Sequence, residues 1–240
     1  MKHFLAGKRV VIIGGSSGIG LAAAKAACEQ GASVHIAARS RNKLLDAIQA
    51  IGGDVTAHEV NAAYEDEMKA LFDSMDLVDH VFVTASEVAT GAVLESDSEQ
   101  LRSSLDSRFW GCYFAAKYAS PKMHRGGSIT FMSGTSSVRP SIGSAVAAAS
   151  GAAVESLART LALELAPIRV NTISAGAIDT PLLDNIFGEK KAAVLAHLTE
   201  QLPVKRMGQP EDIADAALFL MNNSYTTGTV LTVDGGMLVT

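Results

Sequence analysis

Short apolar runs alternate with longer amphipathic segments along this chain. The apolar runs are rich in valine and isoleucine and are too short for helices, so they predict buried strands. We expect strands at residues 9–13, 33–37, 54–60, 80–84, 128–132, 169–173 and 229–233. The longer segments place apolar residues at helical spacing, which predicts helices at 18–30, 40–51, 65–75, 98–123, 144–165 and 210–220.

This alternation of strands and helices predicts one fold class. Strands that are apolar at consecutive positions need cover on both faces, and the helices between them supply it. Because such crossovers are right-handed, we expect a single-domain, doubly wound Rossmann-type α/β fold over residues 1–240, with a parallel sheet of about seven strands. Ligands bind these sheets at the carboxyl ends of the strands, so residues that follow each strand are the first site candidates.

The composition narrows the classes of function. A chain of 240 residues that is 48% hydrophobic can bury a large core, and its net charge of −5 argues against nucleic-acid binding. Cys28 and Cys112 have no paired spacing and the histidines show no metal-ligand pattern, so we expect a cytoplasmic protein without a metal. No apolar run approaches the roughly 20 residues of a membrane span, and no membrane association is expected.

A glycine-rich turn follows the first expected strand and opens the first expected helix. Glycines let the backbone approach a pyrophosphate, and the free N–H groups at the start of a helix attract a phosphate. A tight turn without a ligand is the alternative, but the position between a strand and a helix favours a nucleotide site. We therefore expect a dinucleotide to be bound by Gly14, Ser16, Ser17, Gly18, Ile19 and Gly20.

The end of the second expected strand selects between the two nicotinamide cofactors. A carboxylate there would bond the ribose 2′-hydroxyl and repel a 2′-phosphate. The chain instead offers two guanidinium groups and a hydroxyl, from Arg39, Ser40 and Arg41. A solvated helix start would account for the same residues, but the pattern favours NADP(H).

Several motifs together resemble the short-chain dehydrogenase/reductase family over essentially the whole chain. The glycine spacing of the first turn matches, and so do the segments 169–176, 180–181, 203–212 and 227–236. The resemblance implies an NADP(H)-dependent oxidoreductase. It also implies cofactor contacts from Asn61, Ala85, the backbone of Ile178, and Thr180.

The family's catalytic positions differ in this sequence. Its asparagine, serine, tyrosine and lysine fall at Arg108, Gly134, Ala147 and Gly151. A shift in alignment does not restore the last two, because the chain between Gly126 and Glu189 contains neither tyrosine nor lysine. The tyrosine protonates the alkoxide formed from a carbonyl, and loss of such an acid costs about 10²–10⁴ in rate. A plain alcohol dehydrogenase is therefore not expected.

The first of three remaining interpretations is hydride transfer to a small conjugated acceptor of the flavin or quinone type, with FMN or FAD as a possible substrate. Such an acceptor spreads the incoming charge over its ring and takes its proton from water. The protein then contributes mainly the orientation of two flat rings. Loss of the tyrosine and lysine side chains would leave room for a planar molecule.

Two alternatives stay open. One is a carbonyl reductase or alcohol dehydrogenase that uses substitute groups, with Arg108 or Arg139 as the cation. Its candidate hydroxyls are Ser133 and Ser150, followed by Thr135, Ser136 and Ser144. The other is a non-catalytic NADP(H)-binding protein, acting as a sensor or as a subunit of a mixed oligomer.

The sequence indicates the general character of the substrate and of the oligomeric state, but no more. In the family, the stretch after Thr180 is a mobile substrate lid; here it contains Leu182, Leu183, Ile186 and Phe187. We expect a small apolar or aromatic substrate unless these side chains pack in the core. The helices expected at 98–123 and 144–165 resemble those through which family members dimerise, so we expect a homodimer or homotetramer.

Overall fold

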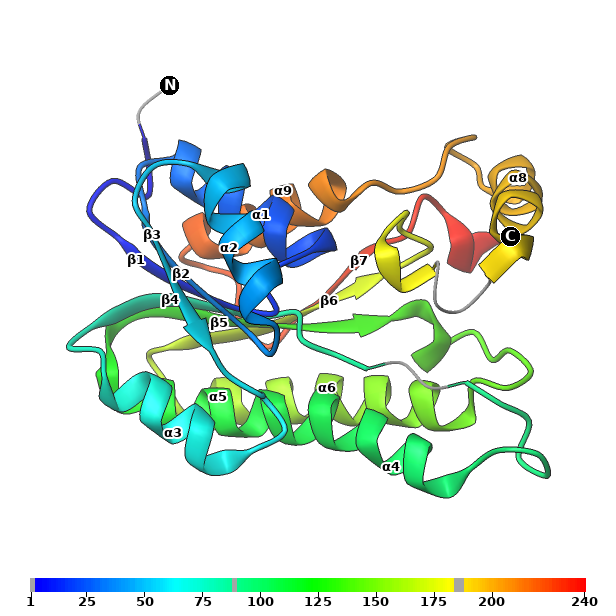
Figure 1. Cartoon of the computed structure of the whole chain (residues 1–240), viewed down its shortest axis with the longest axis horizontal. Helices are drawn as coiled ribbons and strands as arrows, with labels where there is room; N and C mark the ends of the chain where they lie inside the picture. Colours follow the sequence, from blue (N-terminus) through cyan, green and yellow to red (C-terminus); the bar gives the residue numbers. More distant parts are fainter. Residues whose placement is uncertain (1–2, 88–89, 184–187) are drawn as a thin grey trace.

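A computed structural model describes residues 3–87, 90–183 and 188–240 of the chain. One sheet of seven parallel strands runs through the molecule in the order β3-β2-β1-β4-β5-β6-β7 (Figure 1). The strands are β1 (Arg9–Ile13), β2 (Ser33–Ala38), β3 (Val55–Glu59), β4 (Val78–Val83), β5 (Met123–Gly134), β6 (Arg169–Ala175) and β7 (Val230–Val233). The Rossmann-type fold expected from the alternation of elements is confirmed.

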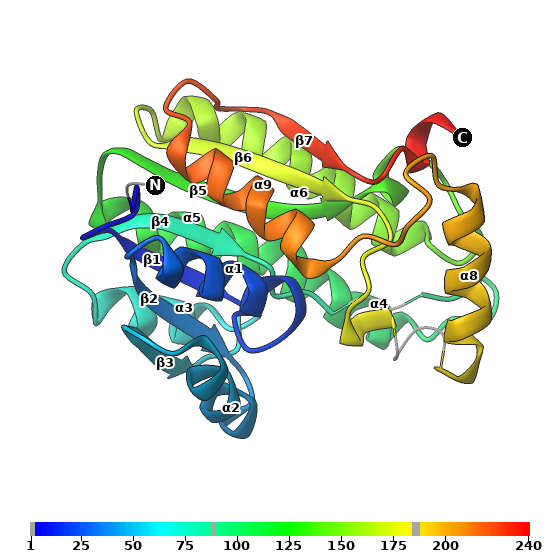
Figure 2. The same cartoon turned by 90° about the horizontal axis from the view of Figure 1, so that it is seen from above.

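Helices cover both faces of this sheet. They are α1 (Gly18–Glu29), α2 (Arg41–Ile51), α3 (Glu65–Asp73), α4 (Ser98–Leu105), α5 (Gly111–Ala119), α6 (Ala145–Glu164), α8 (Lys191–Gln201) and α9 (Pro210–Asn222). Helices α1, α2 and α9 lie on one face, and α3, α5 and α6 lie on the other (Figures 1 and 2). Helix α8, which the sequence pattern did not predict, lies beyond the carboxyl ends of the strands.

Alternate residues of strand β1 pack into two separate hydrophobic cores, one on each face of the sheet. Val10 and Ile12 pack with residues of α1 and α9, whereas Val11 and Ile13 pack with residues of α3, α5 and α6. Each of these side chains is at most 1% exposed. Because successive side chains of a strand point to opposite faces, a sheet covered on both sides needs an unbroken apolar run.

The helix expected at residues 98–123 is present, but it contains a π turn and ends before Met123. α4 ends at Leu105, a π-helical turn spans Asp106–Trp110, and α5 begins at Gly111. Met123 already belongs to β5. A π turn interrupts the α-helical repeat, and such turns are frequent at functional sites.

Helix α6 is apolar enough to be mistaken for a membrane span. Its 20 residues are long enough and apolar enough, with a mean hydropathy of 1.2, to cross a membrane by length and composition alone. The helix packs along β5 and β6, and Val154, Ala158 and Leu161 bury its inner face in the core. Its apolar character is therefore that of a core helix that covers a sheet.

A buried histidine lies toward the amino end of β4, far from the carboxyl ends of the strands. His80 is 5% exposed, and its Nδ1 lies 2.8 Å from Ser128 Oγ. Burial lowers the pKa of His80 to about 4. The neighbouring Asp79 carboxylate, Arg169, Lys8 and His124 change that pKa less than burial does.

This histidine should make the stability of the protein depend on pH. The unfolded chain protonates His80 near its ordinary pKa of 6.5 and the folded chain near 4. Stability is therefore lost as the pH falls through this window, by about 3 kcal/mol in total. In His80→Asn, urea denaturation should show a smaller fall in unfolding free energy between neutral and mildly acidic pH. A fall as large as that of the wild type would contradict the assignment.

Candidate functional site

A cleft of about 750 Å³ opens at the carboxyl edge of the sheet. It lies where β1 and β4 are neighbours, with β2 on the far side of β1 and β5 on the far side of β4. The backbone N–H groups of Thr84 and Ala85 donate to the carbonyl of Ile13 at 2.7 and 2.9 Å and tie the two strand ends together. In open α/β sheets this switch point is where ligands bind.

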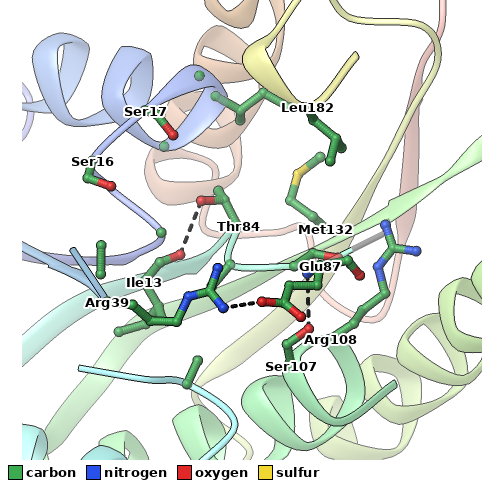
Figure 3. Close-up of a pocket in the computed structure, with 18 of the residues that line it drawn as sticks. Ile13, Ser16, Ser17, Arg39, Thr84, Glu87, Ser107, Arg108, Met132 and Leu182 are labelled. Carbon is green, nitrogen blue, oxygen red and sulfur yellow. Dashed lines mark hydrogen bonds and ion pairs between the residues drawn. The ribbon is translucent and has the colours of Figure 1, made fainter. Parts of the chain in front are cut away.

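The glycine loop after β1 lines this cleft at every position expected to bind the dinucleotide: Gly14, Ser16, Ser17, Gly18, Ile19 and Gly20. Gly14 has a φ of +95°, and a Cβ at this position would lie 2.5 Å from Thr84 Oγ1. Ser17 precedes α1 as its N-cap, and its side chain makes no hydrogen bond to the helix. The first N–H groups of α1 are thus available to a phosphate at the cleft (Figure 3).

Positive side chains gather where β2 ends. Arg39, Ser40 and Lys43 line the cleft. Ser40 caps α2, and its Oγ accepts a hydrogen bond from the Lys43 N–H at 3.4 Å. Arg41, the first residue of α2, is exposed and does not line the cleft. Two of the three residues expected at a 2′-phosphate, Arg39 and Ser40, therefore line the cleft, and Lys43 lines it whereas Arg41 does not.

A carboxylate faces these cations across the cleft. Glu87, in the loop after β4, forms an ion pair with Arg39 (Figure 3). Ser103 Oγ donates to the Glu87 carboxylate at 2.9 Å, and Ser107 Oγ accepts from its backbone N–H at 3.0 Å. Burial acts to raise the pKa of Glu87, but the hydrogen bonds from Ser103 and Arg39 outweigh it and lower the pKa. Glu87 is therefore charged at neutral pH.

The other expected cofactor residues also line the cleft: Asn61, Ala85, Ile178 and Thr180. Asn61 Oδ1 accepts from the N–H of Ala63 at 3.1 Å and shapes the turn after β3. Ile178 pairs with Gly208 in a parallel bridge, which fixes the backbone next to Thr180.

Arg108 extends from the π turn into the cleft (Figure 3). Its Nη1 donates to the carbonyl of Ala147 at 3.3 Å and to Ser150 Oγ at 3.4 Å. The guanidinium thus lies against α6, beside the positions where the resemblance placed a tyrosine and a lysine. Burial lowers the pKa of Arg108. No ion pair within residues 3–87, 90–183 and 188–240 includes this side chain.

Ser133 and Ser150, the leading candidate hydroxyls, are bonded to other protein atoms. Ser133 lines the cleft and donates to Glu155 Oε1 at 2.8 Å. Ser150 donates to the carbonyl of Ala147 at 3.0 Å and does not line the cleft. The glycine at position 134 lines the cleft, whereas Ala147 and Gly151 do not.

The remaining substitutes lie elsewhere. Thr135, Ser136, Ser144 and Arg139 do not line the cleft. The Arg139 guanidinium donates to the carbonyl of Met237 and, at 3.1 Å, to Thr240 Oγ1. It therefore binds the C-terminal turn, because its long side chain finds carbonyl and hydroxyl partners there. Of the expected lid residues, Leu182 and Leu183 line the cleft. Ile186 and Phe187 lie outside the described residues.

Residues that the sequence analysis did not single out complete the cleft, among them Lys43, Tyr64, Glu87, Ser107 and Met132. Glu87 carries a signal that would have identified it, because it is a charged residue shortly after a strand, at the edge where ligands bind. Lys43 carries no such signal, because sequence alone does not show which residues of a first helical turn face the cleft.

Comparison with known proteins decides the family. Residues 14–238 match a family model described as Enoyl-(Acyl carrier protein) reductase. The short-chain dehydrogenase/reductase ucsE of Acremonium sp is 35% identical to this chain, over 97% of this chain and 96% of that protein. The chain belongs to the short-chain dehydrogenase/reductase family. It is an NADP(H)-dependent oxidoreductase that acts on small molecules, as the motifs implied.

Solved structures of the family share the fold over the whole chain. A small-chain dehydrogenase in complex with NADPH is 35% identical, with a TM-score of 0.86, over 97% of this chain and 99% of that one. The MalC reductase/Diels-Alderase of Malbranchea aurantiaca is 30% identical, with a TM-score of 0.92, over 99% of both chains.

The residues of this short-chain dehydrogenase/reductase fit NADP(H). The glycine loop and the open start of α1 suit a pyrophosphate, and Arg39 and Lys43 offer positive charge to a 2′-phosphate. When bound, the cofactor supplies the hydride chemistry. The chain's own residues would bind and orient it, and Arg108 would offer a positive charge in the same cleft.

Arg39→Ala should weaken NADPH binding about 10- to 100-fold, the loss expected for a hydrogen bond to a charged group. NADH, which has no 2′-phosphate, should be affected much less. Arg41→Ala is the matched control, because it removes the same group from outside the cleft and should have little effect. Fluorescence titration of both cofactors measures the loss. Equal weakening of both cofactors by Arg39→Ala would show that Arg39 does not hold the phosphate, and an Arg41→Ala effect as large as that of Arg39→Ala would show that the loss is not specific to the cleft.

Proposed function

We propose that this short-chain dehydrogenase/reductase transfers a hydride from NADPH to a small conjugated acceptor of the flavin or quinone type. The observation that carries the proposal is the face of α6 at Ala147 and Gly151, where neither side chain can donate a proton. The Ser150 hydroxyl beside them is bonded to the carbonyl of Ala147. A flavin or quinone needs no acid from the protein, because its ring delocalises the incoming charge and takes a proton from water.

Arg108 suits such an acceptor. Its guanidinium carries a positive charge at the cleft and stabilises negative charge that develops on the ring during hydride transfer. The interaction is stronger than it would be in bulk water because the guanidinium is largely buried. The bonds to Ala147 and Ser150 hold the group in place before an acceptor arrives.

The apolar lining of the cleft supports a flat, weakly polar acceptor. Met132, Leu182 and Leu183 line it. A Cβ at Gly151 would make ordinary van der Waals contacts with Ser137 Cβ at 3.6 Å and Ser133 Cβ at 3.8 Å, so the room for an acceptor comes from the cleft itself and not from this position. Ring orientation between such walls is the main catalytic contribution of the protein under this proposal.

The second candidate is carbonyl reduction with substitute groups, and Ser133 favours it. Ser133 is at the cleft, and the carboxylate of Glu155 accepts hydrogen bonds from Ser133 at 2.8 Å and from Ser137 at 2.7 Å. In that reaction Ser133 would protonate the alkoxide and Arg108 would stabilise it. A hydroxyl is a much weaker acid than a tyrosine beside a lysine, so we rank this candidate second.

We further propose a cytoplasmic homodimer or homotetramer. Large apolar side chains are exposed along the π turn and α5: Trp110 is 43% and Tyr113 37% exposed. The exposed rings of Trp110 and Tyr113 contact one another and the buried ring of Phe114. Exposed apolar surface of this kind is typical of a subunit interface.

NADPH absorbance, followed with separate panels of acceptors, tests the proposed reaction. Flavins or quinones should oxidise NADPH in the presence of the enzyme, and isolated ketones and aldehydes should not. Arg108→Gln can still donate a hydrogen bond toward α6 but loses the charge, so it should be slower with the same acceptors. Turnover of ketones alone would overturn the proposal in favour of the second candidate.

A further inference from the structure

The ion pair between Arg39 and Glu87 spans the mouth of the cleft. Arg39 follows β2 and Glu87 follows β4, and both strands are neighbours of β1. The pair therefore bridges the end of β1, from which the glycine loop starts. Figure 3 shows the two side chains pointing toward one another.

Serines fix Glu87 in this position. Ser103 Oγ donates to the carboxylate at 2.9 Å, and Ser104 Oγ donates to the Glu87 carbonyl at 2.6 Å. The Glu87 N–H donates to Ser107 Oγ at 3.0 Å. Both the backbone and the charged group are held, so the carboxylate faces the cleft rather than moving freely in solvent.

We propose that Glu87 competes with the 2′-phosphate of NADP(H) for Arg39 and thereby sets the preference of this enzyme between NADPH and NADH. The proposal rests on the assignment of Arg39 to the 2′-phosphate. The Glu87 carboxylate occupies Nη1 of Arg39, so a phosphate that binds the same N–H groups has to displace it. A carboxylate that stays on the rim also repels the phosphate.

The Arg39–Glu87 ion pair is weak enough for a phosphate to replace the carboxylate on Arg39. The Arg39 and Glu87 side chains are 60% and 38% exposed, and ion pairs this accessible to water are weak. A phosphate forms stronger bonds with a guanidinium and gains Lys43 as a second cation. NADPH therefore binds, but less tightly than it would without Glu87. NADH brings no second anion to this point and leaves the ion pair intact.

Titration of NADPH and NADH against Glu87→Gln, at low salt and without any acceptor, tests the inference. The amide is close in size and can still bond Ser103, but it forms no ion pair with Arg39. NADPH should bind about 3- to 10-fold tighter than to the wild type, and NADH should change less than about two-fold. The gain should shrink as salt is added, because the pair is exposed.

Two further variants test whether the effect of Glu87→Gln depends on Arg39. Glu99→Gln removes another exposed carboxylate that lines the cleft, and it should leave the ratio of the two affinities unchanged. In an Arg39→Ala background, Glu87→Gln should lose most of its effect. An unchanged NADPH affinity in Glu87→Gln, an equal gain in Glu99→Gln, or a full gain without Arg39 would each overturn the competition. If Arg39→Ala alone leaves NADPH binding unchanged, the phosphate assignment fails instead. The acceptor plays no part in this measurement.

Discussion

The hydrogen bonds between Arg108 and helix α6 are the constraint on which the reaction end of this protein depends. The guanidinium is long, planar and positively charged, and it reaches the carbonyl of Ala147 and the hydroxyl of Ser150. A tyrosine at position 147 and a lysine at position 151 would bring bulk and a second positive charge to the same helix face. In this chain the guanidinium instead supplies the positive charge beside α6. The π turn of Asp106–Trp110 carries the arginine toward that helix.

The charged residues of the cleft form two groups, one proposed to bind the cofactor and one proposed to act in the reaction. In the first group, the negative charge of Glu87 offsets part of the positive charge of Arg39 and Lys43. An incoming anion therefore has to displace Glu87 from its ion pair with Arg39. In the second group, Arg108 is a cation with no carboxylate partner among the described residues, available to charge that forms during reaction. The glycine loop follows β1, which lies between the strands that precede Arg39 and Glu87. Apart from Arg41, the residues expected at the cofactor line the cleft, whereas the family's proton-transfer positions hold residues that carry no acidic side chain.

Much of the fold and part of the cleft could be predicted from the sequence, because local patterns determine those parts of the structure. The unbroken apolar run of β1 predicted a strand covered on both faces, and the glycine turn predicted the phosphate end of the cleft. The π turn could not be predicted, because its residues also have the composition of an ordinary helix. The choice of Lys43 over Arg41 depends on how α2 is rotated, which the cap at Ser40 sets. The partners of Arg39 and Arg139 depend on tertiary contacts of long, flexible side chains, and no local pattern encodes those.

The central claim is that this enzyme moves a hydride without delivering a proton from its own side chains. The most direct test is the single-turnover rate of NADPH oxidation by a quinone, measured in H₂O and D₂O across neutral and mildly alkaline pH. Parallel runs use NADPH deuterated at the transferred position. If no side chain delivers a proton, the rate should be slower with deuterated NADPH, the solvent isotope ratio should be near unity, and the rate should not vary with pH. A rate that slows in D₂O and follows the titration of a single group would contradict it.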